Sequence, residues 1–161
     1  MSNFKIEEKG AFRLVGFKTK LEGSEKIQSE LFSKQKTEFF KGIIQGGKMA
    51  SLKPISECNY GYGAITTDGS NTFYYAGVKT AQPVINETEE VLFPEGKYLV
   101  LEGKGGLSRL AFDSLEDQAF KDILTKECDY GYSGNPIAEI LLNGNPADSE
   151  VEVWIPVREK Q

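Results

Sequence analysis

Histidine is absent from this 161-residue sequence. Histidine is the side chain whose unperturbed charge changes closest to neutral pH, and it is a common general base and metal ligand. Its absence excludes Ser-His-Asp and Cys-His catalytic arrangements as well as histidine metal sites. Any catalysis would therefore depend on carboxylates, tyrosines or lysines.

Cysteine occurs only twice, as Cys58 and Cys128, and no apolar run approaches the length of about 18 residues that suggests a membrane span. The first ten residues, MSNFKIEEKG, lack the basic and then hydrophobic layout of a secretion signal. Two cysteines in such a chain are typical of reduced thiols, and we expect small buried hydrophobes rather than a disulfide. The expected location is cytoplasmic, without a membrane partner.

The composition is ordinary for a soluble globular protein, with 39% hydrophobic and 27% charged residues. A chain of this length buries enough surface to fold as one domain, residues 1–161, without disulfides, metals or cofactors. The net charge of −5 argues against nucleic acid as a partner, because nucleic acid requires a basic face, and it is compatible with a cationic ligand. We expect a monomer or a weak homodimer.

A short pattern, Glu-Cys-x-Tyr-Gly-Tyr, occurs at residues 57–62 and again at 127–132. In the first half it follows a segment whose apolar residues recur at three- and four-residue steps. This periodicity predicts a helix that begins after Ser24 and stops at 46–47, where two glycines stand. A strand over 12–20 precedes the helix, and a hairpin with the turn signal Asp-Gly-Ser-Asn follows it.

The second half repeats this order. A strand at Lys97–Glu102 precedes a helical stretch over 107–126, whose expected buried stripe includes Leu107 and Leu110. Another hairpin begins at Ile137, after the second copy of the pattern. The chain therefore has the appearance of a duplicated unit.

The order of elements predicts an α+β fold built from two pseudo-symmetric β-α-β-β repeats, at approximately 1–80 and 88–161. Two such units can pair through their antiparallel sheets with the helices packed outside. A central ligand cleft is expected where the halves meet.

The last predicted hairpin carries two carboxylates. If it closes at residues 142 and 149, Glu139 lies directly opposite Glu152 on one face, with Trp154 beside Glu152. Like charges in opposed positions are destabilising, so such a pair is either protonated with a raised pKa or ready to bind a cation. The alternative interpretation is a solvated outer face with two exposed glutamates.

Aromatic residues are frequent at the predicted strands and strand entries. Aromatic faces attract flat or quaternary cations by about 0.5–2 kcal/mol each, so two carboxylates within an aromatic wall would favour a lipophilic organic cation. For any single tyrosine, packing in the core is the alternative. The residues concerned are Tyr60, Tyr62, Phe73, Tyr74, Tyr75, Tyr98, Tyr130, Tyr132 and Trp154.

Three segments, PEGKYLVLEGKG, PIAEILLNG and EVEVWIPV, together resemble the GyrI-like effector-binding domain, also called the AraC-type effector-binding domain. The resemblance covers nearly the whole chain and implies two β-α-β-β repeats around a central pocket. In multidrug-sensing members a buried glutamate in an aromatic cage binds lipophilic cations, and Glu139 matches that glutamate. Glu152 and Trp154 match the acidic and aromatic positions of the last strand, and Tyr62 and Tyr75 are the candidates from the first hairpin.

The resemblance implies a small-molecule binding protein, for lipophilic aromatic cations, in transcription regulation or compound sequestration. We expect a stand-alone member with no direct nucleic-acid contact, because the sequence leaves no room for a helix-turn-helix domain. Glu139→Gln is expected to abolish cation binding with little loss of fold. The alternative is a glutamate-dependent hydrolase of electrophilic small molecules in the same pocket. A module for binding a protein partner is a third hypothesis, disfavoured because the sequence has no long acidic run.

Overall fold

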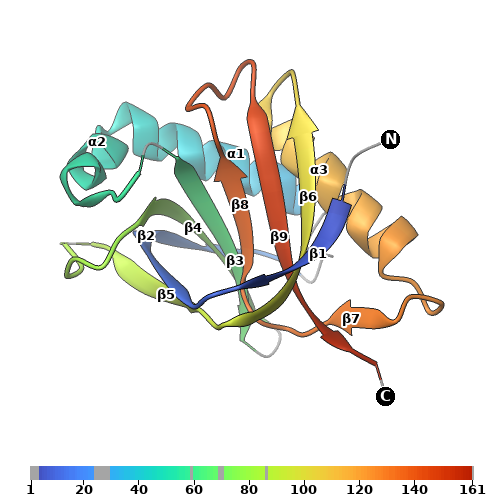
Figure 1. Cartoon of the computed structure of the whole chain (residues 1–161). Coiled ribbons are helices and arrows are strands. Elements are labelled where there is room, and N and C mark those ends of the chain that lie inside the picture. The colour runs from blue at the N-terminus through green and yellow to red at the C-terminus, as the bar shows by residue number, and fades with distance from the viewer. Residues whose placement is uncertain (1–3, 24–29, 59, 69–70, 86, 161) are drawn as a thin grey trace.

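The chain folds into one curved sheet with helices on one face (Figure 1). The structure is a computed structural model that describes residues 4–23, 30–58, 60–68, 71–85 and 87–160. The strands are β1 (Phe4–Lys9), β2 (Phe12–Leu21), β3 (Gly61–Asp68), β4 (Asn71–Lys79), β5 (Glu89–Phe93), β6 (Gly96–Lys104), β7 (Tyr130–Tyr132), β8 (Ile137–Leu141) and β9 (Glu150–Glu159). The helices are α1 (Glu30–Gln45), α2 (Lys48–Leu52) and α3 (Ser108–Gln118), with a 3-10 turn at Lys53–Ile55 and a π-helical turn at Ala119–Ile123.

The sheet is antiparallel throughout the described residues, in the order β1-β6-β9-β8-β3-β4-β2-β5, and β7 pairs with β9. The predicted order of strand, helix and hairpin occurs twice, as β2-α1-β3-β4 and as β6-α3-β8-β9. The two units join where β3 pairs with β8, and Ala64 lies opposite Ala138 at that junction. The predicted α+β class is therefore confirmed.

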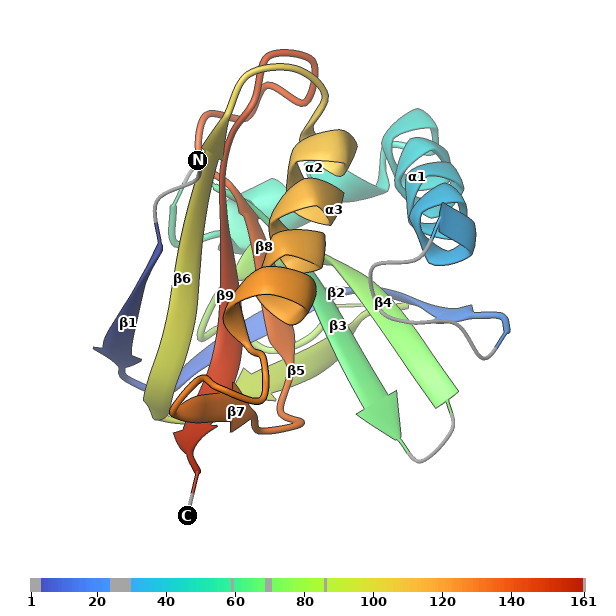
Figure 2. The same ribbon diagram turned by 90° about the vertical axis from the view of Figure 1, so that its right-hand side faces the viewer.

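Both long helices cover the same face of the sheet, which we call the helix face (Figure 2). Phe32 from α1 and Phe112 from α3 belong to the same buried cluster as Ile137 and Val153 from the central strands. Each helix buries an apolar stripe in this way, and burial of a large apolar side chain contributes about 1.5–3 kcal/mol.

The opposite side of the sheet, which we call the inner face, carries a second apolar cluster. It includes Tyr62, Tyr75 and Tyr98, with Trp154 packed against it. The sheet curls around this cluster, since the Phe12 ring of β2 lies 5.5 Å from the Trp154 ring of β9 although the two strands are not neighbours. The curl brings aromatic side chains from both ends of the sheet together.

The first predicted helix ends where its glycines indicate, and Gly47 has a φ of 70° in the left-handed region that favours glycine. Its predicted start at Ser24 lies outside the described residues. In the second helix the predicted stripe is wrong at two positions, because Leu107 and Leu110 are 56% and 63% exposed. The helix instead turns Phe112 toward the sheet.

Cys58 and Cys128 are free thiols in loops, and both are half-buried where the prediction was full burial. In its first copy the repeated tyrosine-glycine pattern leads into β3, and in its second copy it forms the short strand β7. None of the described helices is long and apolar enough to cross a membrane.

Candidate functional site

The register of the β8–β9 hairpin differs by one residue from the prediction. Glu139 pairs with Val153, and Glu152 pairs with Ile140. The hairpin closes with the Leu142 amide donating to the Glu150 carbonyl oxygen at 2.8 Å, not at residues 142 and 149. Because a one-residue shift moves a side chain to the other face, Glu139 lies on the helix face and Glu152 on the inner face.

Glu139 is 1% exposed and is held by groups from three different elements. The Arg109 guanidinium of α3 donates to both carboxylate oxygens, with Nη1–Oε1 2.9 Å and Nη2–Oε2 2.5 Å. The Tyr74 hydroxyl of β4 donates to Oε1 at 2.9 Å, and the Lys36 ammonium of α1 lies 3.7 Å from Oε2. The carboxylate thus accepts a bidentate pair of strong, charge-assisted hydrogen bonds from Arg109.

Gly63 gives the Tyr74 hydroxyl the space to reach this carboxylate. Gly63 lies directly opposite Glu139 on β3, and a Cβ atom at Gly63 would collide with the Tyr74 hydroxyl. A glycine inside a strand often marks such a close approach.

Three further polar side chains complete the cluster. Arg109 also binds Asp113, with Nε–Oδ1 3.0 Å, and the Ser33 hydroxyl of α1 donates to the same Asp113, which links α1 to α3. Glu116 is fully buried, with Oε1 3.7 Å from the Lys36 ammonium and 3.9 Å from Arg109. Its two oxygens accept no hydrogen bond from any residue that the structure describes.

Aromatic rings surround the two cations. The Arg109 guanidinium carbon lies 5.3 Å from the Phe112 ring centroid and 6.0 Å from that of Tyr74, and the Lys36 ammonium lies 5.5 Å from Tyr74. These distances fall within the usual range of cation–π contacts. We call this group the acid cage, and its members are Ser33, Lys36, Tyr74, Arg109, Phe112, Asp113, Glu116 and Glu139.

Burial and charge shift the pKa values of the two glutamates of the acid cage in opposite directions. Burial favours the neutral form of Glu139, but the charges of Arg109 and Lys36 outweigh it and hold the pKa of Glu139 well below its usual range. Burial, together with the negative charge of Glu139, raises the pKa of Glu116 well above its usual range. The same two causes raise the pKa of Tyr74, so this hydroxyl remains a hydrogen-bond donor.

The other four predicted site residues lie together on the inner face. The Trp154 indole N–H donates to the Glu152 carboxylate at 2.8 Å, and both side chains are half-buried. Tyr62 and Tyr75 are each 8% exposed and belong to the inner-face cluster. The Lys9 ammonium lies 4.3 Å from the centroid of the Trp154 ring. The sheet therefore separates Glu139 from these four residues.

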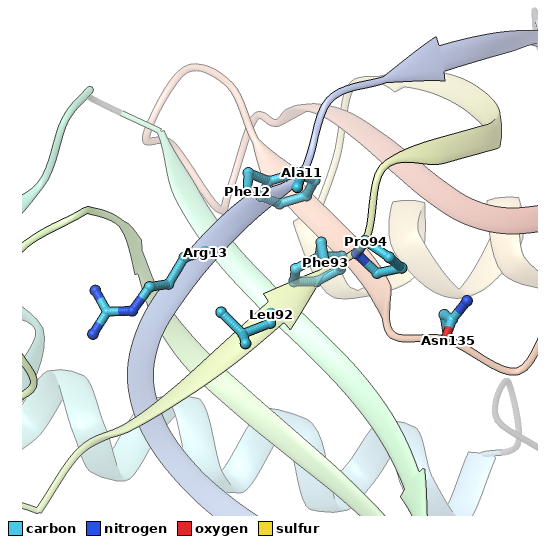
Figure 3. A pocket seen from close by; sticks show the side chains of 7 residues that line it. All are labelled: Ala11, Phe12, Arg13, Leu92, Phe93, Pro94 and Asn135. Atoms are coloured by element: carbon cyan, nitrogen blue, oxygen red, sulfur yellow. The ribbon is translucent and has the colours of Figure 1, made fainter.

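An open hollow of about 530 Å³ lies where β2 begins and β5 ends (Figure 3). The Phe12 and Phe93 rings stack at 4.4 Å beside it. The charged group among its lining residues, Arg13, is bound to the carbonyl oxygens of Thr80 and Gln82 at 3.0 Å and 2.6 Å. We assign no ligand to this hollow, which is lined by Ala11, Phe12, Arg13, Leu92, Phe93, Pro94 and Asn135.

Sequence reasoning missed the charged members of the acid cage contributed by the helices. The signal was a charged residue at helical spacing within an apolar stripe. Lys36 stands four residues after Phe32, and Glu116 stands four residues after Phe112. A charge at such a position must be paired when the helix docks, so the spacing itself indicates a buried polar cluster.

Solved structures with the same fold include three proteins of low sequence identity. SAV2435 bound to tetraphenylphosphonium is 17% identical, has a TM-score of 0.75, and covers 97% of this chain and 94% of that chain. A protein from Staphylococcus aureus MU50, provisionally assigned to bacterial transcription regulation, is 16% identical with a TM-score of 0.74 over 97% and 98% of the two chains. An integron cassette protein from the mobile metagenome of Vibrio cholerae is 15% identical with a TM-score of 0.67 over 96% and 95%.

A search of curated protein sequences finds no significant match. The model of one protein family, described as integron-associated effector binding protein, matches residues 5–157. This match covers nearly the whole chain and agrees with the resemblance to GyrI-like effector-binding domains. The protein belongs to the family of integron-associated effector binding proteins.

Proposed function

We propose that this protein binds a small organic cation in the acid cage between α1, α3 and the sheet. The observation that carries the proposal is Glu139, an ionised carboxylate that is 1% exposed and lies against Tyr74 in an effector-binding fold. The tetraphenylphosphonium bound to a structure of the same fold supports a cationic ligand.

Burial favours the acid cage over the inner face. Two opposite charges about 4 Å apart attract by about 1 kcal/mol in water and by about 4 kcal/mol near a protein surface. Glu139 is almost fully buried, whereas Glu152 is half-buried and lies next to the exposed Glu102. Solvent therefore weakens the interaction of Glu139 with a cation less than that of Glu152.

The protein's own side chains support a preference of the acid cage for flat and compact cations. A guanidinium and an ammonium are already held between carboxylates and the Tyr74 and Phe112 rings. A ligand with a delocalised or quaternary charge would make the same contacts, which contribute about 0.5–2 kcal/mol per ring.

The route of entry lies between the two helices. Arg109 and Asp113 are 14% and 19% exposed at their side chains, so the acid cage borders solvent there. The hydrogen bond from Ser33 to Asp113 closes this gap. Separation of α1 from α3 admits the ligand, and the altered helix position is the change that a regulator would recognise. A protein that sequesters the compound needs only the binding step.

Isothermal titration calorimetry with tetraphenylphosphonium tests the site, using the same isosteric change on each face. Glu139→Gln removes the charge of the acid cage, and Glu152→Gln removes that of the inner face. We expect Glu139→Gln to weaken binding by about tenfold or more, since bonds to charged groups contribute about 1.5–3 kcal/mol, and Glu152→Gln to change it by less than about twofold. The reverse ranking would place the ligand on the inner face and overturn the proposal.

Circular dichroism must show that Glu139→Gln is folded before its affinity is interpreted. A second pair of variants, Phe112→Leu and Trp154→Leu, removes one ring from each face without removing a charge. We expect only Phe112→Leu to weaken binding. Equal effects from the two ring variants would contradict the assignment even if Glu139→Gln failed to fold.

A second candidate function, hydrolysis, is supported by the proximity of Glu116 and Glu139. A pair of carboxyl groups whose pKa values are driven apart can serve as acid and base. Incubation with a strained electrophilic compound distinguishes the two functions, because a hydrolase forms product and loses activity in Glu116→Gln. A binding protein reaches saturation without product.

A further inference from the structure

The acid cage contains one more carboxyl group than it has cations. Glu139, Asp113 and Glu116 face Lys36 and Arg109 within the described residues. If all five were ionised, this buried group would carry a net negative charge. Unbalanced charge in a low-dielectric interior is strongly unfavourable, and a buried acid avoids it by retaining its proton.

Of the three carboxyl groups, Glu116 interacts most weakly with the two cations. Arg109 contacts Glu139 at 2.5 Å and Asp113 at 2.9 Å, but it lies 3.9 Å from Glu116. Both Glu116 oxygens are buried and accept no hydrogen bond from a described residue, whereas Glu139 has three donors around it.

Within the described residues, the charged groups with the largest effects on Glu116 come from three elements. Glu139 comes from β8, Lys36 from α1 and Arg109 from α3, and the Tyr74 hydroxyl of β4 remains protonated. Glu139 and burial raise the pKa of Glu116 more than Lys36 and Arg109 lower it. Glu116 is therefore the carboxyl group of the acid cage that retains a proton most readily.

We propose that a cation binds in the acid cage in exchange for the proton held on Glu116. The inference rests on the proposed function and extends it, because it assigns Glu116 as a ligand-binding residue and couples binding to pH. The O–H bond of Glu116 breaks, the proton passes to a base in solution, and the carboxylate that remains is neutralised by the ligand. The acid cage is electrically neutral before and after the exchange.

Displacement of Arg109 is the competing way to keep the charge balanced. It would break two bonds to Glu139, two contacts to Asp113 and the stacking on Phe112. Removal of the Glu116 proton breaks none of these contacts. The structure therefore favours proton exchange.

Calorimetric titration with tetraphenylphosphonium in phosphate and in Tris buffer measures the exchange, because these buffers differ in their heat of ionisation. The probe carries a permanent charge, so any proton that is released comes from the protein. We expect about one proton to be released by the wild type and none by Glu116→Gln. The affinity of the wild type should increase with pH by up to tenfold per unit, and Glu116→Gln should remove this dependence. Glu102→Gln, an exposed control, should behave as the wild type.

An infrared measurement without ligand provides an independent check. A protonated carboxyl group has a carbonyl stretching band that a carboxylate lacks, and we expect the free protein to show this band at neutral pH and Glu116→Gln to lose it. Binding of the probe without proton release, or absence of the band, overturns the proton exchange and leaves the proposed function intact. If the wild type fails to bind any cationic probe, both the proposed function and the exchange fall.

Discussion

At the scale of single residues, the acid cage shows how charges are retained in an apolar interior. Lys36 and Glu139 are each 1% exposed, and each is paired with an opposite charge. Such a network contributes less net stability than its contacts suggest, because desolvation offsets much of the attraction. Loss of one member leaves its partner buried without compensation.

Arg109→Met should therefore lower the free energy of unfolding by about 3–5 kcal/mol. Glu139→Gln should have a similar cost. This corrects the expectation from the sequence that Glu139→Gln causes little loss of fold. Urea denaturation measures both variants. Combining the two changes should cost less than the sum of the single changes, since neither charge is then left alone. Lys97→Met, which breaks an exposed pair with Glu159, is the control and should cost less than about 1 kcal/mol.

Gly63→Ala should disturb the acid cage without touching a charge. The added methyl group takes the position of the Tyr74 hydroxyl, and overpacking of this kind costs about 1–3 kcal/mol. Gly61→Ala in the same strand meets only Leu141 at 3.8 Å and should be nearly neutral. Thermal denaturation compares them. Addition of Tyr74→Phe to Gly63→Ala should recover part of the loss, and a double variant less stable than Gly63→Ala would refute this explanation.

At the scale of elements, the proposed route of ligand entry depends on the contact between α1 and α3. Each helix packs on the sheet through its own apolar residues, and polar side chains bridge the gap between the helices. Helices held by few direct contacts can separate while the sheet remains intact. The gap is therefore the part of the fold best suited to opening.

Ser33→Ala should make this opening more frequent. The variant removes the hydrogen bond to Asp113, which contributes about 0.5–1.5 kcal/mol. Hydrogen exchange of the α1 amides should accelerate by several fold, while exchange in β8 and β9 should be unchanged. Ser51→Ala in α2, whose hydroxyl bonds only to the local Lys48 carbonyl oxygen among the described residues, is the control. Equal acceleration by both variants would contradict the role of Ser33.

At the scale of the whole molecule, two similar units form one sheet with two different faces. The units join at β3 and β8, so both Glu139 and its neighbour Gly63 lie at the centre of the structure. The buried charges lie on the helix face with Tyr74, and Trp154 lies on the inner face with Tyr62, Tyr75 and Tyr98. A movement of either unit would therefore displace residues of the acid cage.

The pH dependence of global stability should reflect both glutamates of the acid cage, with opposite signs. The pKa of Glu139 is lowered by folding, so its contribution is present above the unfolded value of about 4.3 and is lost as the pH falls. The pKa of Glu116 is raised, so its contribution is present at acidic pH and is lost as the pH rises toward the folded value. Glu116→Gln should remove only the second effect.

Thermal denaturation across a pH series tests this prediction. The stability advantage of Glu116→Gln over the wild type should grow with pH above about 4.3, by up to about 1.4 kcal/mol per unit. Glu102→Gln provides the matched exposed control. A constant difference between Glu116→Gln and the wild type at every pH would show that Glu116 is ionised in the folded protein.

The sequence by itself determined the order of strand, helix and hairpin in the two β-α-β-β units and the end of the first helix. These features depend on local periodicity and on glycines, which act over a few residues. It also marked Glu139 as a candidate through the family resemblance. The sequence did not identify the partners of Glu139, because they come from α1, α3 and β4, which are far apart in the chain.

Only the tertiary structure decided which side chains share a face. The loop between β8 and β9 closes one residue later than the pattern suggested, with the Asn143 side chain accepting from the Glu150 amide at 3.3 Å. This one-residue shift in register places Glu139 on the helix face, on the side opposite to Glu152. The same alternation makes Tyr74, not Tyr75, the tyrosine that binds Glu139. Side chains alternate with a period of two, so a small difference in loop geometry reverses the composition of a site.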